Sequence, residues 1–291
     1  MKIIIPASGE GSRFKSKGYS DPKPLIDVTS TKKIIDYVFD IFDVQKDEFF
    51  IISSASQYDQ MQYHLEESGI NFKHFLHDGE KLGPVGCVLD SKELNDLFNK
   101  EDEVIVSYCD YGLEWDYSDF LNFIDENKPD GVIPCYTGYH PHLEDENNVY
   151  AACKTIDSSN RVYEVKEKYH SSDRYNELWS AGLYYFKTYE CMIESFEKLV
   201  KSGEKLNGEY YVSLAYNNMC SEKRVFSYNK IHTFYQFGTP VDFEYAKKNI
   251  LRTQNIDNDD SDISNIVILS AGKGERFLNL GFNQPKPFLP L

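Results

Sequence analysis

The sequence predicts an α/β domain whose mainly parallel sheet is flanked by helices. Short apolar runs alternate with segments of helical periodicity along most of the chain, and this rhythm is typical of β-α-β units. Apolar residues make up 41% of the 291 residues, with 22 tyrosines and 19 phenylalanines, so a substantial core is available. A glycine-rich segment directly follows the first apolar run, at the edge of the sheet where α/β domains bind ligands.

The expected elements follow in chain order from these patterns. Short apolar or β-branched runs predict strands over 3–6, 49–54, 72–77, 103–110, 131–136, 148–157, 161–169, 178–186, 224–229 and 231–238. Helical spacing of apolar residues predicts helices over 33–42, 57–69, 84–97, 119–126, 189–200, 208–219 and 240–251. Gly69 is the expected end of the second helix, and Pro84 and Pro240 are expected to begin the third and the last.

One segment of the sequence occurs twice. IIIPASGEGSRFKSKGYSDPKPL at 3–25 aligns without a gap with IVILSAGKGERFLNLGFNQPKPF at 266–288. Glycine, arginine, lysine and proline recur at fixed spacing, and each has its own backbone or charge requirement. We therefore expect a complete domain over 1–251, an acidic linker over 252–263 and the truncated start of a second domain over 264–291. So short a segment cannot bury a core, so we expect the chain to be a fragment of a longer tandem protein.

The bulk composition narrows the class of protein. A formal net charge of −16 argues against binding to nucleic acid or to an anionic membrane surface, both of which require clusters of lysine and arginine. The six cysteines contain no C-x-x-C pair, which favours reduced, buried thiols over a structural zinc site. No signal peptide precedes the first strand and no apolar run could span a membrane, so we expect a cytoplasmic protein. The composition is compatible with a homo-oligomer and leaves the oligomeric state open.

The loop after the first strand has the features of a phosphate-binding loop. Backbone N–H groups of Ala7, Ser8, Gly9, Glu10 and Gly11 can surround one point, and the glycines allow a ligand to approach the backbone closely. The loop is not a dinucleotide fingerprint, because a phenylalanine occupies the place of the third glycine. It is not a Walker loop either, because Gly-Lys-Ser/Thr is missing.

Two cations accompany this loop. Arg13 offers a planar fork that can hold two phosphate oxygens, and Lys23 lies between Pro22 and Pro24, which restrict the backbone and so aim the lysine. Two cations aimed at one phosphate chain can stabilise the charge on a leaving pyrophosphate. The alternative is a surface turn that carries an arginine and a lysine, but such a turn has no reason to be duplicated.

The motif G-x-G-x-R-F followed by P-K-P-L resembles the signature of the sugar-phosphate nucleotidyltransferases, also called nucleotide-sugar pyrophosphorylases. The resemblance extends, more thinly, through about residue 250. It implies a Rossmann-like α/β domain of nucleotidyltransferase type, with a mixed sheet flanked by helices. It also implies an Mg²⁺-dependent enzyme that joins a nucleoside triphosphate to a phosphorylated acceptor and releases pyrophosphate, as in the synthesis of polysaccharide precursors. Gly9, Gly11, Arg13 and Lys23 match the family's triphosphate loop and its catalytic cations.

Further landmarks of that family can be matched residue by residue. Gly83, in LGPVGCVL, lies in a segment that resembles the base-contacting segment, and Asp110, after VIVSYC, resembles the metal-binding aspartate. Glu167 and Lys168 in VYEVKEK would contact the acceptor's hydroxyls and phosphate, and Gly182 in SAGLYYF would let the acceptor pack closely. Each match has a structural alternative: a helix start, a turn cap, a solvated strand end, or a glycine required for packing. The location of Asp110 at the ligand-binding edge favours Mg²⁺ ligation.

The sequence departs from the family at one position. FYQFGTPVDF resembles the family's W-x-D-x-G-T-P-x-D segment, so Gln236 stands where the family has its second metal-binding aspartate. A neutral amide coordinates Mg²⁺ weakly and supplies no charge. Either Asp110 and the substrate phosphates hold the metal, or this domain is catalytically impaired. Asp242 lies nearby, but we expect it in the first turn of the last helix, where acidic residues are favoured.

Three functions remain open at this point. The first is transfer of a nucleoside monophosphate to a sugar 1-phosphate, or to another small phosphorylated acceptor such as phosphocholine, and this reaction needs no protein nucleophile. The second is a glycosyltransferase of GT-A-like fold that uses a nucleotide sugar; such enzymes usually carry D-x-D, whereas Asp110-Tyr111-Gly112 lacks the second acid. The third is a catalytically impaired regulatory domain that binds nucleotide. The arginine and lysine signature favours the first.

Overall fold

The computed structural model describes residues 1–140, 143, 150–156 and 159–257. The chain divides into two compact units, Met1–Lys248 and Asn249–Leu291. The sheets and the predicted site belong to the first unit, and the last helix crosses the boundary between the units. The second copy of the repeated motif and the predicted second domain, 264–291, lie outside the described residues.

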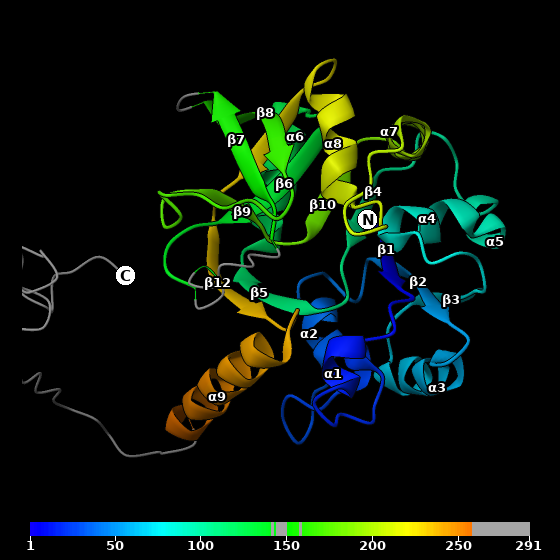
Figure 1. The fold of residues 1–291 in the computed structure, drawn as a ribbon, viewed down its shortest axis with the longest axis vertical. Helices are drawn as coiled ribbons and strands as arrows, with labels where there is room; N and C mark the ends of the chain where they lie inside the picture. The colour runs from blue at the N-terminus through cyan, green and yellow to red at the C-terminus, as the bar shows by residue number, and fades with distance from the viewer. Residues whose placement is uncertain (141–142, 144–149, 157–158, 258–291) are drawn as a thin grey trace, which may run out of the picture. The chain divides into compact units, whose positions relative to one another are not determined.

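Ten strands of the described residues form one mixed sheet, in the order β11-β8-β7-β9-β6-β10-β4-β1-β2-β3 (Figure 1). β1 is parallel to β2 and β4, and β2 is parallel to β3, whereas β10 is antiparallel to both β4 and β6. β10 therefore joins a parallel part of the sheet to a part where most pairs are antiparallel. The strands span β1 (Lys2–Ala7), β2 (Glu48–Ser54), β3 (Phe72–His77), β4 (Val104–Ser107), β6 (Gly131–Tyr136), β7 (Ala152–Ile156), β8 (Arg161–Lys166), β9 (Leu178–Ser180), β10 (Leu183–Phe186) and β11 (Val225–Tyr228).

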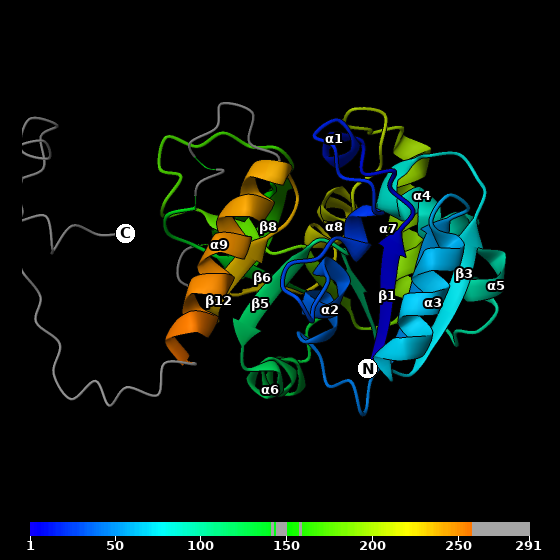
Figure 2. The ribbon, with the colours of Figure 1, turned by 90° about the horizontal axis from the view of Figure 1, so that it is seen from below.

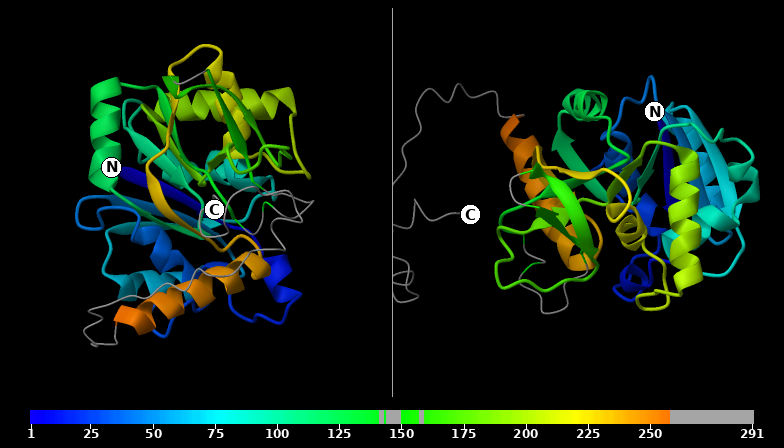
Figure 3. Two further views of the ribbon diagram at one scale, coloured as in Figure 1. Left: turned by 90° about the vertical axis from the view of Figure 1, so that its left-hand side faces the viewer. Right: turned by 90° about the horizontal axis from the view of Figure 1, so that it is seen from above.

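A separate antiparallel pair consists of β5 (Tyr111–Trp115) and β12 (Ile231–Gln236). Helices lie on both sides of the parallel part of the large sheet (Figures 2 and 3). No helix in the described part of the chain is both long enough and apolar enough to cross a membrane. The helices span α1 (Ser12–Lys15), α2 (Ile34–Phe39), α3 (Tyr58–Ser68), α4 (Gly83–Asp90), α5 (Lys92–Asn95), α6 (Tyr117–Asn127), α7 (Tyr189–Ser202), α8 (Val212–Cys220) and α9 (Pro240–Asp257), with a 3₁₀ turn at Lys23–Leu25.

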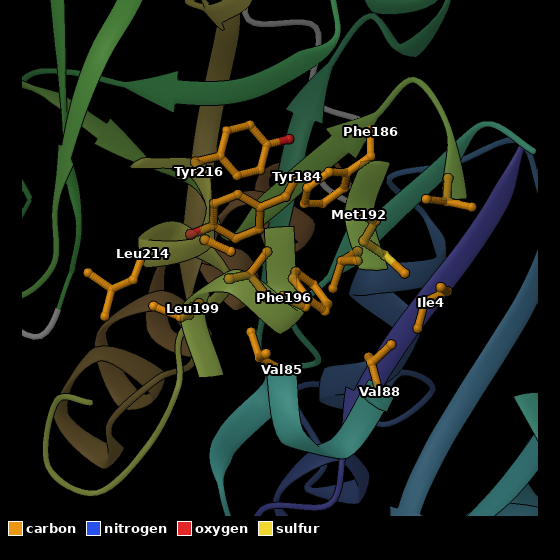
Figure 4. Packing of buried hydrophobic residues seen from close by; sticks show 14 of the residues in the cluster. Ile4, Val85, Val88, Tyr184, Phe186, Met192, Phe196, Leu199, Leu214 and Tyr216 are labelled. Atoms are coloured by element: carbon orange, nitrogen blue, oxygen red, sulfur yellow. The ribbon is translucent and has the colours of Figure 1, made fainter. Parts of the chain in front are cut away.

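The central strands alternate their side chains between two cores. Ile4 and Phe50 belong to a buried cluster that includes residues of α4, α7 and α8 (Figure 4). Ile3, Ile5 and Phe49 belong to a second cluster on the other side, which includes residues of α2 and α3. Because both faces are buried, these strands are continuously apolar and lack the polar alternation of a half-exposed strand. Each fully buried side chain of this size stabilises the fold by about 1.5–3 kcal/mol.

Several element boundaries agree with the sequence signals. Gly69 adopts a left-handed conformation, with φ of 71°, directly after α3, as expected for a C-terminal glycine. Pro240 begins α9, and the preceding Thr239 exchanges side-chain and backbone hydrogen bonds with Asp242. These contacts confirm the prediction that Asp242 lies in the first turn of this helix. The α/β fold with a mixed sheet is also confirmed, and all six cysteines are free thiols.

Several elements differ from the sequence-based expectation; among them, the predicted helix 208–219 begins only at Val212 and the predicted strand 161–169 ends at Lys166. The predicted helix 84–97 is interrupted at Ser91, whose ψ of 82° is not helical, and the predicted strand 178–186 is interrupted at Gly182, whose φ is 90°. The predicted strand 103–110 ends at Ser107, so that Asp110 lies in the short connection to β5. α9 continues through Asp257, so the first residues of the predicted linker are helical; 258–263 lie outside the described residues. At Gly182 a contact explains the difference, because Tyr108 N donates to the carbonyl of Gly182 and local composition cannot reveal this pairing.

Candidate active site

A cavity of about 500 Å³ lies at the carboxyl ends of β1, β3 and β4. Its lining comes from segments that are far apart in the sequence, and it brings together nearly all of the predicted site residues. Those that line it are Ser8, Gly9, Glu10, Gly11, Arg13, Lys23, Gly83, Asp110, Glu167, Lys168, Gly182 and Gln236. The exception is Ala7, which is buried as the last residue of β1, with its carbonyl accepting a hydrogen bond from Gln57 Nε2. Ala7 therefore supports the loop from behind and does not line the cavity.

The two glycines of the loop meet different requirements. Gly11 has a left-handed φ of 61° and immediately precedes α1, and a Cβ atom there would lie 3.1 Å from Lys23 Cβ. Gly11 thus allows the Lys23 segment to pack against the loop. A Cβ atom at Gly9 would meet nothing within 4 Å, so this stretch of backbone is open to the cavity. Arg13 is exposed in α1 and also lines the cavity.

Lys23 and Asp110 form an ion pair in the cavity. Lys23 Nζ donates hydrogen bonds to Asp110 Oδ2 at 2.6 Å and to the carbonyl of Gly238 at 2.9 Å. Their side chains are 14% and 29% exposed, so water screens the pair only in part. The backbone of Asp110 is fixed from the other side, because its carbonyl accepts a hydrogen bond from Phe237 N at 3.0 Å. The predicted catalytic lysine and the predicted metal ligand therefore lie side by side.

The oxygen atoms around Lys23 Nζ are of the type that Mg²⁺ prefers. A carboxylate oxygen of Asp110 and the carbonyl oxygen of Gly238 both contact the ammonium group, which occupies the place of a cation. Among the described residues there is no group of three or more His, Cys, Asp or Glu that could hold a metal. Gln236 lines the cavity and is buried, and its amide nitrogen donates to Tyr136 Oη at 3.2 Å. The residues present therefore fit a metal held by Asp110 with oxygens from a ligand.

Glu10 lies in the phosphate-type loop, and two lysines balance the negative charge of its carboxylate. Its carboxylate accepts hydrogen bonds from Lys81 Nζ at 2.8 Å and from Lys15 Nζ at 2.9 Å. These contacts, that of Lys81 above all, lower the pKa of Glu10 to about 2. Two cations are thereby held next to the loop, one from α1 and one from the connection between β3 and α4.

Glu167 and Lys168 follow β8 and line the cavity together. Burial raises the pKa of Glu167 to about 7, although a hydrogen bond from Ser213 Oγ and the charge of Lys168 both act in the opposite direction. Lys168 has a left-handed φ of 50°, which is unusual for a residue with a side chain. Its Nζ donates a hydrogen bond to Tyr211 Oη at 3.1 Å.

Gly83 and Gly182 line the cavity, and both are also required for packing. A Cβ atom at Gly83 would lie 2.8 Å from Glu209 Cβ, and one at Gly182 would lie 3.3 Å from Tyr108 Cδ2. Both glycines have left-handed φ values, 82° and 90°. The packing explanation that the sequence left open therefore applies to both positions.

The cavity wall also has an aromatic and polar part that the sequence patterns did not indicate. This part of the wall consists of Tyr108, Tyr150, Tyr184, Tyr211, Phe234, His77 and Glu209. His77 is the last residue of β3, so the rule that placed Asp110 at the ligand-binding edge could also have found this histidine. The tyrosines and the phenylalanine carry no such signal, because these residue types are ordinary core residues, and a lone glutamate such as Glu209 is usually a solvated surface residue.

The chain matches known proteins over most of its length. The family profile described as "Nucleotidyl transferase" matches residues 2–249. The bifunctional protein GlmU of Methanocaldococcus jannaschii is 24% identical over 281 residues, which are 97% of this chain but only 61% of the length of that relative. This chain therefore spans less than two thirds of that protein.

Two solved structures share the fold. The nucleoside-diphosphate-sugar pyrophosphorylase of Vibrio cholerae RC9 has a TM-score of 0.70 and 21% identity, covering 84% of this chain and 99% of its own. A UDP-glucose pyrophosphorylase complexed with UDP-glucose has a TM-score of 0.69 and 17% identity, covering 87% and 98%. With the profile match over most of the chain, these findings show that the protein belongs to the nucleotidyl transferase family.

Proposed function

We propose that this chain transfers a nucleoside monophosphate from a nucleoside triphosphate to a sugar 1-phosphate or a similar phosphorylated acceptor, with release of pyrophosphate. The observation that carries this proposal is the content of a single cavity. The phosphate-type loop, Arg13 and the Lys23–Asp110 pair line it together with Glu167 and Lys168. Such a cavity offers positive groups for two phosphorylated substrates at once.

The reaction is a direct displacement. A phosphate oxygen of the acceptor forms a bond to the α-phosphorus of the nucleotide, and the bond from this phosphorus to the bridging oxygen of the pyrophosphate breaks. The leaving pyrophosphate takes the electron pair, and Arg13 and Lys23 stabilise its charge. Lys168 binds the acceptor phosphate and Glu167 binds an acceptor hydroxyl. Catalysis then consists of positioning and charge stabilisation, so no protein nucleophile is required.

Mg²⁺ is part of this proposal. Asp110 would hold it, together with oxygens of the substrate phosphates, and the metal would neutralise phosphate charge when bound. Gln236 is the reason for a second candidate function, a domain that binds nucleotide without turnover, because its amide supplies no charge and already donates to Tyr136. A glycosyltransferase is less favoured, because Gly112 stands in place of a second acid, and a Cβ atom there would lie 3.1 Å from Tyr37 Cβ.

The experiment is a pyrophosphate-release assay with Mg²⁺. CTP, UTP, GTP, ATP and dTTP are each combined with a panel of hexose 1-phosphates and with phosphocholine. A hexose 1-phosphate is the first acceptor to test, since one relative of the same fold is named as a UDP-glucose pyrophosphorylase. We expect release with one pair of substrates, reduced at least about 100-fold in Lys23→Ala and Asp110→Ala.

Lys17→Ala is the matched control, because this exposed lysine is close in sequence but is not among the cavity-lining residues. It should retain wild-type activity. Thermal stabilisation by one nucleotide without pyrophosphate release for any pair would support the binding-only function. If every nucleotide fails both to release pyrophosphate and to stabilise the protein thermally, both proposals are contradicted.

A further inference from the structure

Five consecutive residues before and at the start of α8 contact both sides of the cavity. We call residues 209–213 the strap. Glu209 and Tyr211 line the cavity directly, and none of the five was assigned a role by the sequence. Around the cavity, the strap contacts two groups of residues. One is Leu82, Gly83 and Val85 at the start of α4, and the other is Tyr108, Glu167 and Lys168.

One end of the strap is fixed to the first turn of α4. Tyr210 N donates to the carbonyl of Leu82 at 2.8 Å, and Val85 N donates to the carbonyl of Tyr210 at 3.3 Å. Between these bonds lies Gly83, where a Cβ atom would be 2.8 Å from Glu209 Cβ. The strap and α4 thus pack backbone against backbone, which leaves little freedom for relative movement.

The other end of the strap reaches the predicted acceptor-binding residues. Lys168 Nζ donates to Tyr211 Oη at 3.1 Å and lies 4.9 Å from the centre of the Tyr211 ring. Tyr211 Oη in turn donates to Glu209 Oε2 at 2.7 Å. Glu209 therefore orients the tyrosine hydroxyl so that its lone pairs face the lysine. Two residues further on, Ser213 Oγ donates to Glu167.

We propose that Tyr211 is a positioning residue for the acceptor phosphate. Its hydroxyl, oriented by Glu209, holds Lys168 Nζ in the cavity before the acceptor arrives. A free lysine side chain samples many rotamers, and ordering it beforehand reduces the entropy cost of binding. Because the strap is also fixed to α4, Lys168 is held at a constant place relative to the nucleotide side of the cavity. The identity of the acceptor rests on the proposed function, whereas the hold on Lys168 does not.

The first test is steady-state kinetics of Tyr211→Phe with the pair of substrates that the wild type uses. The variant keeps the ring against which Lys168 lies and removes only the hydroxyl. We expect the KM for the acceptor to rise about tenfold, while the KM for the nucleotide changes less than about twofold. Tyr163→Phe is the control, because this tyrosine on β8 is 52% exposed and does not line the cavity.

A double variant separates positioning from a structural effect. If Tyr211 acts through Lys168, Tyr211→Phe should have little further effect on the acceptor KM in a Lys168→Ala background. Full additivity of the two effects, or an equal rise of both KM values, would overturn the proposal. Glu209→Gln is a second variant, which weakens the orientation of the hydroxyl and should raise the acceptor KM in the same direction.

A third measurement needs no substrate. Wild type and Tyr211→Phe are acetylated with an amine-reactive reagent, and modification of Lys168 is followed by mass spectrometry. An amine that is held by a hydrogen bond reacts more slowly than one that moves freely, so we expect Lys168 to be modified several-fold faster in the variant. Equal rates would overturn the proposal. If the wild type transfers no nucleotide, the proposed function fails, and the labelling rates still decide whether Tyr211 holds Lys168.

Discussion

Glu167 is a carboxyl group whose surroundings favour its neutral form. Burial raises its pKa to about 7, and Ser213 and Lys168 only partly offset this effect. Near neutral pH both protonation states are populated. The neutral form can donate a hydrogen bond and the ionised form can only accept, so in the proposed reaction the protonation state would select how an acceptor hydroxyl is bound.

We expect Glu167→Gln to change how stability depends on pH. The folded protein keeps this proton where the unfolded chain has lost it, so the wild type loses stability as pH rises from about 4.5 to about 7. Partial exposure to the cavity limits this loss to about 2 kcal/mol. Between about pH 5 and about pH 8, the free energy of unfolding of the variant relative to wild type should therefore rise by this amount in urea titrations. Glu164→Gln, whose side chain is 42% exposed, is the control, and the same pH dependence in both variants would contradict the prediction.

Glu10 is a second acidic residue whose removal should change ligand binding. Glu10→Gln removes a negative charge beside the loop and releases Lys15 and Lys81, which can then contact phosphate oxygens. We expect nucleoside triphosphate to bind several-fold more tightly at low salt, with a smaller gain at high salt because the charges are exposed. Isothermal titration calorimetry at two salt concentrations measures this. Glu67→Gln makes the same charge change on an exposed part of α3, and an equal gain in that variant would point to net charge alone.

At the scale of elements, the sequence predicted existence and type better than boundaries. β1 and β2 were predictable because strands buried on both faces are continuously apolar. The break between β9 and β10 was not, since SAGLYYF continues the apolar pattern and the left-handed Gly182 is fixed by its contact with Tyr108. β5 was also missed. Its pairing with β12 is a contact between distant segments, which local composition cannot reveal.

The junction between α4 and the strap can be tested with a pair of glycines. Gly83 and Gly208 have nearly the same φ, 82° and 83°, but only Gly83 has close neighbours at the position of a Cβ atom. Gly208→Ala should cost about 1 kcal/mol of unfolding free energy from backbone strain alone. Gly83→Ala should cost about 2–4 kcal/mol, because Glu209 and Tyr210 must also move. Equal losses in guanidinium unfolding would mean that α4 and the strap are not closely packed in solution.

At the scale of the whole molecule, one cavity collects residues from both parts of the sheet. The phosphate-type loop, Lys23 and Asp110 were predictable because three features have few purely structural uses together: a glycine-rich loop directly after a strand, a lysine between two prolines, and an acid just beyond a buried strand. The strap was not, because GEYYVS reads as the beginning of a helix and its value lies in contacts with Leu82 and Lys168. Gly83 and Gly182 were predicted because they were expected to lie against a ligand, yet each is also required for packing against neighbouring residues.

The end of the first domain can be tested by truncation. The family profile ends at residue 249 and α9 ends at Asp257, so a chain of residues 1–257 should fold alone. We expect its Tm to lie within about two degrees of that of the 291-residue chain, with unchanged nucleotide binding. Calorimetry of the two chains measures this. A large fall in Tm would show that 258–291 stabilise the first unit.

The pairing of β5 with β12 also has a consequence for the order in which parts of this protein fold. Asp110 directly precedes β5, and its carbonyl accepts a hydrogen bond from Phe237, just after β12. Contacts between segments so distant in sequence close slowly, because the entropy of the long intervening loop must be overcome first. The parallel strands can pair early during synthesis, but Asp110 is fixed only once residues 236–238 have left the ribosome and docked. If the cavity binds nucleotide as proposed, the recovery of nucleotide binding during refolding should report the docking of residues 236–238 against Asp110, and it should lag behind the recovery of secondary structure.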